Sequence, residues 1–281
     1  MKRFFKIALW SIGGLLLLLF TAGSIFVYKI KNGFPVSYET EMPSIEFPPG
    51  KKAVLLFSKS TGFRHEGSIE AGKGAFAALA QKNDWFLYST EEGGVFNPEQ
   101  LAHFSAVIFN NSTGRVLNDE QQKALEQYVE QGGSLIGIHG AGDNSHHWEW
   151  YVQHLTGSEF SHHAITAELQ RTDVIRETVP DSLLSQGLPG RWSQADEWYV
   201  FFEQPEAKGF HILLSIDGET ISPDGNILFV KDKNFGMGKH HPVAWYRKTG
   251  KGRTFYTSMG HDASAWQQES FVRLLENAVA Y

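Results

Sequence analysis

Histidine is the side chain best suited to chemistry near neutral pH, because its ordinary pKa is about 6.5. The chain has 12 histidines, and six of them fall within one stretch of the sequence. They are His139, His146, His147, His154, His162 and His163. This density is more than packing needs, and imidazoles transfer protons and bind divalent metals. The sequence therefore predicts a histidine-based site.

One of these imidazoles lies at a predicted strand end. Leu135–Ile138 has the length and flanks of a buried parallel strand, and His139 follows it at once. Asp143 and Asn144 are predicted to cap a helix after a glycine-rich turn. A strand, a sharp turn and a helix resemble a nucleophile elbow, but the central residue here is an imidazole with no Ser or Cys beside it. Acyl transfer through a covalent nucleophile is therefore not predicted at this residue.

Three further candidate side chains follow other predicted strands. Arg64 and His65 lie in the loop after the apolar run Ala53–Phe57, and His261 follows the run Thr254–Ser258. In open α/β sheets, ligands bind outside the carboxyl ends of the strands. These side chains are therefore predicted to line one cleft together with the imidazole at the elbow.

Two adjacent carboxylates, Asp196 and Glu197, precede the strand-like run Trp198–Phe202. We expect one of them to face the cleft and the other to cap a turn or pair with an arginine. Three histidines, or two with a carboxylate, would suit zinc or another divalent ion. The spacing matches no compact motif such as His-Glu-x-x-His, so the sequence defines no set of metal ligands.

Apolar runs alternate with helical patterns in the first part of the chain, which predicts an α/β domain with a doubly wound, mostly parallel sheet. The predicted strands are Ala53–Phe57, Trp85–Tyr88, Ala106–Phe109 and Leu135–Ile138. Asn97 and Asn118 are predicted to cap two of the helices. After about residue 160 we expect further strands, a subset of which are antiparallel and lie at the sheet edge. These are Ala164–Gln170, Trp198–Phe202, Phe210–Ile216, Pro242–Tyr246 and Thr254–Ser258.

The amino-terminal segment Ile7–Tyr28 is apolar and, at about 1.5 Å per residue, long enough to cross a hydrocarbon core of about 30 Å. Its length and the lack of an Ala-x-Ala site favour an uncleaved transmembrane anchor over a signal peptide. The flanking basic residues favour residues 1–6 as a cytoplasmic tail, with the rest on the extracytoplasmic, periplasmic side. Residues 29–50 hold four prolines and are predicted to be an extended linker. Residues 51–281 remain for one domain.

Composition excludes several classes of function. The formal net charge is −6 and no basic stretch stands out beyond the amino terminus, so nucleic-acid binding is not expected. The chain has no cysteine, which excludes disulfides, thiolate metal sites and a lipoprotein anchor.

Several short motifs follow one another along residues 53–281. They are Gly62–His65, Gly137–Gly142, Trp150–Tyr151, Leu155–His163, Asp196–Tyr199, and Pro242–Trp245 followed by Gly250–Asp262. In this order they resemble the ThuA-like family of trehalose utilisation, whose fold is similar to that of class I glutamine amidotransferases. The resemblance implies sugar catabolism, in settings where glycosides are first oxidised to 3-keto sugars. In the amidotransferase fold a cysteine stands at the elbow, so His139 implies that glutaminase activity is absent.

Our leading hypothesis is therefore an enzyme that processes a 3-keto glycoside by acid and base chemistry. His139 or His261 would be the base, Glu197 or Asp262 its partner or the acid, and either Arg64 or a divalent metal the electrophile. The residues expected to contact the carbohydrate are Arg64, His65, Asp143, Trp150, Tyr199 and Trp245. Two alternatives remain: a sugar- or partner-binding module without catalysis, and a metal-dependent hydrolase of another substrate.

Overall fold

The structure is a computed structural model that describes residues 2–32, 38–144, 146–181 and 183–281. A sheet of nine strands runs through the domain in the order β2-β1-β3-β4-β11-β10-β9-β6-β7, and β5 pairs with β8 beside it. The strands are β1 Ala53–Phe57, β2 Phe86–Thr90, β3 Phe104–Asn110, β4 Ser134–Ile138, β5 Phe160–His162, β6 Gln170–Arg176, β7 Arg191–Asp196, β8 Val200–Phe201, β9 His211–Asp217, β10 His240–Thr249 and β11 Gly252–Thr257. The helices are α1 Lys2–Asn32, α2 Glu66–Asn83, α3 Pro98–Leu101, α4 Asp119–Gln131, α5 Glu149–Tyr151 and α6 Glu269–Ala280.

The sheet has a parallel half and an antiparallel half. Strands β2, β1, β3, β4 and β11 are parallel to their neighbours in that order. From β11 onward, β10, β9, β6 and β7 pair antiparallel. The predicted α/β fold with added antiparallel strands is therefore confirmed. The parallel half brings the carboxyl ends of β1, β3, β4 and β11 to one edge, which is where such sheets bind ligands.

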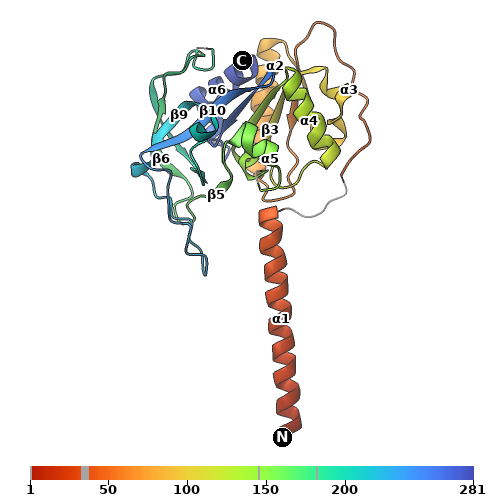
Figure 1. The fold of residues 1–281 in the computed structure, drawn as a ribbon, viewed down its shortest axis with the longest axis vertical. Coiled ribbons are helices and arrows are strands. Elements are labelled where there is room, and N and C mark those ends of the chain that lie inside the picture. The colour runs from red at the N-terminus through yellow and green to blue at the C-terminus, as the bar shows by residue number, and fades with distance from the viewer. Residues whose placement is uncertain (1, 33–37, 145, 182) are drawn as a thin grey trace.

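Helices cover both faces of the parallel half (Figure 1). Successive side chains of a strand point to opposite faces, so Leu55 packs in one core with Leu125 of α4, whereas its neighbour Leu56 packs in the other core with Phe76 of α2. The asparagine caps are present as predicted. Asn118 accepts a hydrogen bond from the Gln121 backbone and receives the reciprocal bond of a capping box.

Two local predictions were wrong. Ala164–Leu169 is not a strand, and β6 begins at Gln170. Asp143 and Asn144 do not cap a helix, because the chain after β4 forms the 3-10 helix His139–Asn144 and α5 begins only at Glu149. Glycines at 140 and 142 permit this tight turn, since a Cβ at Gly142 would lie 2.3 Å from the Tyr256 hydroxyl.

The amino-terminal helix α1 leaves the domain as a lone rod (Figure 1). Its span Lys6–Tyr28 is apolar, and none of it is buried inside the protein. Its length and composition fit a membrane anchor or a signal sequence.

The described part of the predicted linker, residues 38–50, packs on the domain instead of extending away from it. Lys59 forms an ion pair of 2.5 Å with Glu39, and the Gln121 side chain donates to the Glu39 carbonyl at 2.6 Å. Phe47 lies edge-on to Phe86, with 5.7 Å between the ring centroids. Aromatic and charged side chains thus attach this segment to the domain, although its prolines suggested an extended linker in solvent.

Candidate functional site

His139 occupies the sharp turn at the end of β4, where its φ is +43°. A non-glycine residue rarely adopts this conformation, and such strain persists where the surroundings enforce it. The imidazole is fully buried, and its Nδ1 donates a hydrogen bond of 2.6 Å to the carbonyl oxygen of Ser258. A carbonyl can only accept, so Nδ1 carries the proton. The lone pair of His139 Nε2 therefore points to the other side of the ring.

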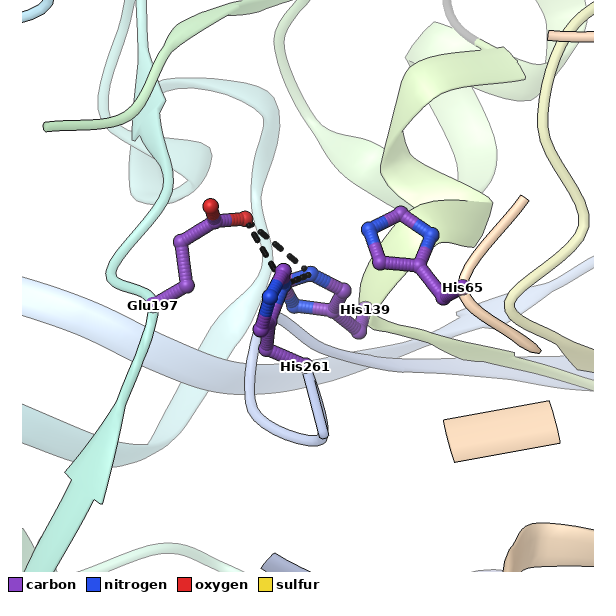
Figure 2. A group of neighbouring side chains, drawn as sticks. All are labelled: His65, His139, Glu197 and His261. Atoms are coloured by element: carbon purple, nitrogen blue, oxygen red, sulfur yellow. Dashed lines mark hydrogen bonds and ion pairs between the residues drawn. The ribbon is translucent and has the colours of Figure 1, made fainter. Parts of the chain in front are cut away.

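Three side chains, those of His65, Glu197 and His261, meet His139 on that side of its ring (Figure 2). One nitrogen or oxygen atom from each lies within 4.8 Å of the others. His139 Nε2 is 3.2 Å from His261 Nδ1 and 3.3 Å from Glu197 Oε2. His261 Nδ1 is 3.2 Å from the same carboxylate oxygen. We call these four residues the His-Glu cluster.

Outer contacts orient two of the imidazoles in the cluster. His139 Nδ1 is bonded to Ser258, and His261 Nε2 lies 3.3 Å from Glu168 Oε1. In each ring the outer nitrogen faces an oxygen acceptor, which leaves the lone pair of the inner nitrogen directed into the cluster. This is how second-shell partners fix histidine ligands in metal sites.

Glu197 is the buried anion of the cluster and is 1% exposed. Burial alone would raise its pKa, but the imidazoles of His139, His163 and His261 hold the pKa of Glu197 well below its ordinary value. His163 Nδ1 forms an ion pair of 2.9 Å with Glu197 Oε1. Burial lowers the pKa of His163 and of His261, and Glu197 more than offsets this, so both values are raised. The carboxylate therefore stays ionised throughout the physiological range.

Asp196 holds the two walls of the cluster together and does not face the cavity. Its carboxylate accepts hydrogen bonds from the backbone N–H groups of Gly260 at 2.9 Å, His261 at 3.0 Å and Glu197 at 3.0 Å. The side chain of Gln194 donates a fourth bond, of 2.9 Å. Of the adjacent carboxylates, Glu197 thus faces the cluster and Asp196 ties the β11–α6 loop to the end of β7.

His65 completes the cluster from the loop before α2. Its ring lies edge-on to His139 at 4.9 Å and to His261 at 5.1 Å. Burial, together with the neighbouring imidazoles, lowers the pKa of His65 to about 2. A Cβ at Gly140 would lie 3.0 Å from His65 Nδ1, so glycine there permits the close approach. The ring is therefore neutral, which is the form that binds metal ions.

The residues of the cluster fit a divalent metal ion. Three imidazoles and one carboxylate are the donors that zinc and related ions prefer. The four donor atoms, one from each residue, lie close enough together to share a single ion.

A cavity of about 500 Å³ opens in front of the cluster, which is within the usual range for a small-molecule site. Its lining combines aromatic rings with titratable groups. It is formed by Phe63, His65, Asp143, His146, Glu159, Phe160, Ser161, His163, Glu168, Glu197, Tyr199, Phe202, Lys233 and His261. The Tyr199 ring lies over His139, with 4.2 Å between centroids. Burial and Glu197 raise the pKa of Tyr199 well above its ordinary value, so the phenol stays neutral.

Asp143 and His146 form a pair on the cavity wall, with Asp143 Oδ1 3.1 Å from His146 Nε2. Burial raises the pKa of Asp143, although His146 opposes the shift. A carboxyl group with a raised pKa is a better base near neutral pH than an ordinary one.

Five of the residues predicted for the site do not line this cavity. One of them, His139, is fully buried within the His-Glu cluster, and the other four lie outside the cluster. Asp262 closes a turn by accepting from the backbone and hydroxyl of Ser264. Arg64 forms a two-pronged ion pair with Glu91 through its outer nitrogens. Trp245 is fully buried and donates to the Leu155 carbonyl at 3.1 Å, and Trp150 stacks on Trp148 at the edge of the core.

Sequence reasoning assigned no role to several residues that line the cavity. His146 and His163 belong to the histidine-rich stretch, so their density was a usable signal. Glu168, Phe202 and Lys233 gave none, because they come from segments without a motif that pack here only in three dimensions.

The metal-free protein is expected to lose stability on both sides of about pH 6.5. Unfolding lets His65 take up a proton, because its folded pKa lies far below 6.5, so its contribution falls as the pH drops below that value. Folding raises the pKa values of His163 and His261, so these two residues stabilise the folded state below pH 6.5. This stabilisation is lost as the pH rises through their folded pKa values. Urea unfolding in chelator between pH 5 and 8 measures this. Below pH 6.5, His65→Gln should reduce the loss in the free energy of unfolding by about 1.4 kcal/mol per pH unit. An unchanged slope of this free energy against pH would contradict a neutral, buried His65.

The family model described as ThuA, trehalose utilisation, matches residues 53–281. The fold is similar to that of a ThuA-like protein from Bacteroides uniformis ATCC 8492, at 23% identity and a TM-score of 0.67 over 88% of this chain and 94% of that one. A ThuA-like protein from Parabacteroides merdae ATCC 43184 is similar at 16% identity and a TM-score of 0.58, over 81% of this chain and 88% of that one. A cytoplasmic protein from Salmonella typhimurium LT2 is similar at 11% identity and a TM-score of 0.54, over 81% of this chain and 98% of that one. No curated protein matches the chain.

Proposed function

The chain belongs to the ThuA family, and on this premise we propose that it is a metal-dependent enzyme of carbohydrate catabolism whose substrates are oxidised, 3-keto glycosides. The observation that carries the proposal is the His-Glu cluster at the end of a cavity large enough for a sugar. Aromatic rings on the cavity wall, Phe63 and Phe160 among them, suit the apolar faces of sugar rings. We place the domain on the extracytoplasmic side, with α1 as the anchor.

The reaction we propose is an elimination. A ketone at C3 acidifies the proton on C2. A base in the cavity removes this proton, the electron pair forms a double bond between C1 and C2, and the bond from C1 to the glycosidic oxygen breaks. The departing oxygen takes a proton from an acid in the cavity. A divalent ion would polarise the C3 carbonyl oxygen.

The residues divide into two groups for this reaction. The inner nitrogens of His139 and His261 point into the His-Glu cluster, so a bound ion would occupy the lone pairs that a base needs. The base and acid must then come from the cavity wall. Asp143, with its raised pKa, is our candidate for the base, and His146 at 3.1 Å is the partner that carries the proton onward.

Metal binding tests the first half of the proposal. Chelator-treated full-length protein is expected to bind one zinc or manganese ion per chain, and His65→Gln should lower the affinity by at least about 10-fold, since even outer-shell changes cost 10- to 100-fold. Isothermal titration calorimetry in detergent measures both. His103→Gln is the matched control, because His103 is exposed and stacks on Phe47, outside the His-Glu cluster. Wild-type protein that binds no divalent ion would refute the metal site.

Turnover tests the second half. The metal-loaded protein is expected to release the leaving sugar from 3-keto disaccharides and to leave the unoxidised disaccharides intact. Asp143→Asn should lower kcat by about 10²- to 10⁴-fold, the usual contribution of an acid or base, without changing metal affinity. Product analysis by mass spectrometry follows the reaction. Binding of sugar without any product would favour a binding module, and cleavage of unoxidised sugars would favour a hydrolase.

A further inference from the structure

An apolar turn projects into solvent at the tip of the loop between β9 and β10. Within this segment, residues 222–239, the consecutive side chains of Ile227, Leu228, Phe229 and Val230 are 49%, 78%, 99% and 45% exposed. Four consecutive apolar side chains that are all at least 45% exposed are unusual on a protein surface and mark a contact site for an apolar partner. We call these four residues the apolar tip.

The apolar tip is a turn with a defined backbone conformation. Ile227 and Val230 exchange two backbone hydrogen bonds, of 3.1 and 2.8 Å, and Leu228 between them has a φ of +45°. A β-type hydrogen-bond pair and a left-handed leucine hold the two central side chains outward. The exposure therefore belongs to a defined conformation of the loop.

The base of the loop is fixed to the domain, so the tip does not fold back over the cavity. Gly225 donates a hydrogen bond of 2.7 Å to the Lys233 carbonyl, and Ile165 donates one of 3.0 Å to the carbonyl of Asp224. His162 Nε2 donates to the Pro223 carbonyl at 3.0 Å. Only the base reaches the cavity, through Lys233, which bonds Ser161 at 3.1 Å.

The direction of the loop indicates its partner. Figure 1 shows the segment between β9 and β10 projecting from the domain on the side from which α1 departs. Helix α1 is long and apolar enough to span a bilayer, so a membrane that holds α1 lies on this side. Lys231 directly follows the tip and is exposed, and a lysine beside inserted apolar groups favours anionic lipid headgroups.

We propose that the apolar tip inserts into the interfacial layer of the same bilayer that holds α1. The domain then contacts the membrane at two places, which restricts its rotation about the anchor. Because Lys233 joins the tip to the cavity wall, insertion sets the cavity mouth close to the lipid surface. The proposal rests on the anchor role of α1 and is independent of the metal and of the reaction.

The test uses the absence of cysteine, since one introduced cysteine is the only labelling site. Full-length Phe229→Cys carries an environment-sensitive fluorophore and is reconstituted in vesicles of phosphatidylcholine and phosphatidylglycerol. Nitroxide-labelled lipids quench a fluorophore that sits among them. We expect strong quenching at position 229. Lys123→Cys, on the exposed side of α4 away from the loop, is the unquenched control, and Leu16→Cys in α1 is the quenched one.

A second variant separates insertion from mere proximity. With the label moved to Asp232→Cys, the double change Leu228→Ser and Phe229→Ser should reduce quenching to the level of the Lys123 control. Phosphatidylcholine alone should give weaker quenching than the mixture with the anionic lipid. A label at position 229 whose emission shows that it stays in water overturns the proposal. A label that is shielded from water but is not quenched by the lipids also overturns it, because the tip then packs on protein. So does an unquenched label in α1. None of these outcomes bears on metal binding or turnover.

Discussion

Glu197→Gln is expected to lower metal affinity and turnover of 3-keto glycosides by at least about 100-fold each, because the change removes the single anion of the His-Glu cluster. Substitution of a direct ligand should lower metal affinity at least as much as substitution of a second-shell partner. The carboxylate faces three imidazoles at 2.9 to 3.3 Å. Glutamine keeps the shape but loses the charge. Calorimetry and steady-state kinetics on the same preparations measure the two losses.

Two carboxylates outside the cluster serve as controls for this substitution. The side chain of Glu203 is exposed and approaches Lys208 at 3.7 Å, outside the cluster, so Glu203→Gln should leave both properties unchanged. Glu168 lies behind His261, and Glu168→Gln should lower metal affinity by about 10-fold. In chelator, NMR titration should show lower pKa values for His163 and His261 in Glu197→Gln, since the carboxylate raises both. Wild-type metal affinity in this variant would refute the assigned ligand set.

Asp196→Ala is expected to destabilise the metal-free protein by about 3 kcal/mol or more. The substitution leaves three buried backbone N–H groups, those of Glu197, Gly260 and His261, without an acceptor. Each orphaned buried donor costs about 1–3 kcal/mol. Urea unfolding at pH 7 in chelator measures the change, and metal affinity should fall as well because both Glu197 and His261 lose their common support.

The neighbouring acid Asp262 provides the comparison for this prediction. It closes an exposed turn with Ser264, so Asp262→Ala should cost only about 1 kcal/mol and leave metal affinity intact. Asp196→Asn should restore part of the stability, because its one carbonyl oxygen accepts some of the bonds and its amide group repels the remaining donors. Equal losses in the two alanine variants would contradict the central structural role of Asp196.

Local pattern was enough to predict most of the parallel half of the fold. Alternation of apolar runs with helical patterns predicted β1, β3 and β4 to within a few residues, and Asn118 forms the expected cap. These elements depend on short-range rules of burial, propensity and capping, which adjacent residues express directly. The stretch Ala164–Gln170 alternates like a strand yet forms none before its last residue, because pairing partners in space, and not alternation alone, decide whether a strand forms.

The sequence by itself determined that imidazoles would stand at strand ends: His139 after β4, His261 after β11 and His65 after β1. Only the tertiary structure decided which acids join them. Asp196 and Glu197 are adjacent and chemically alike, and the turn at the end of β7 directs one to backbone donors and the other to the histidines. It also decided that Tyr199 lies over His139 while Trp245 lies in the core. Direction and distance between segments far apart in sequence depend on how the whole sheet packs, and no local spacing carries that information.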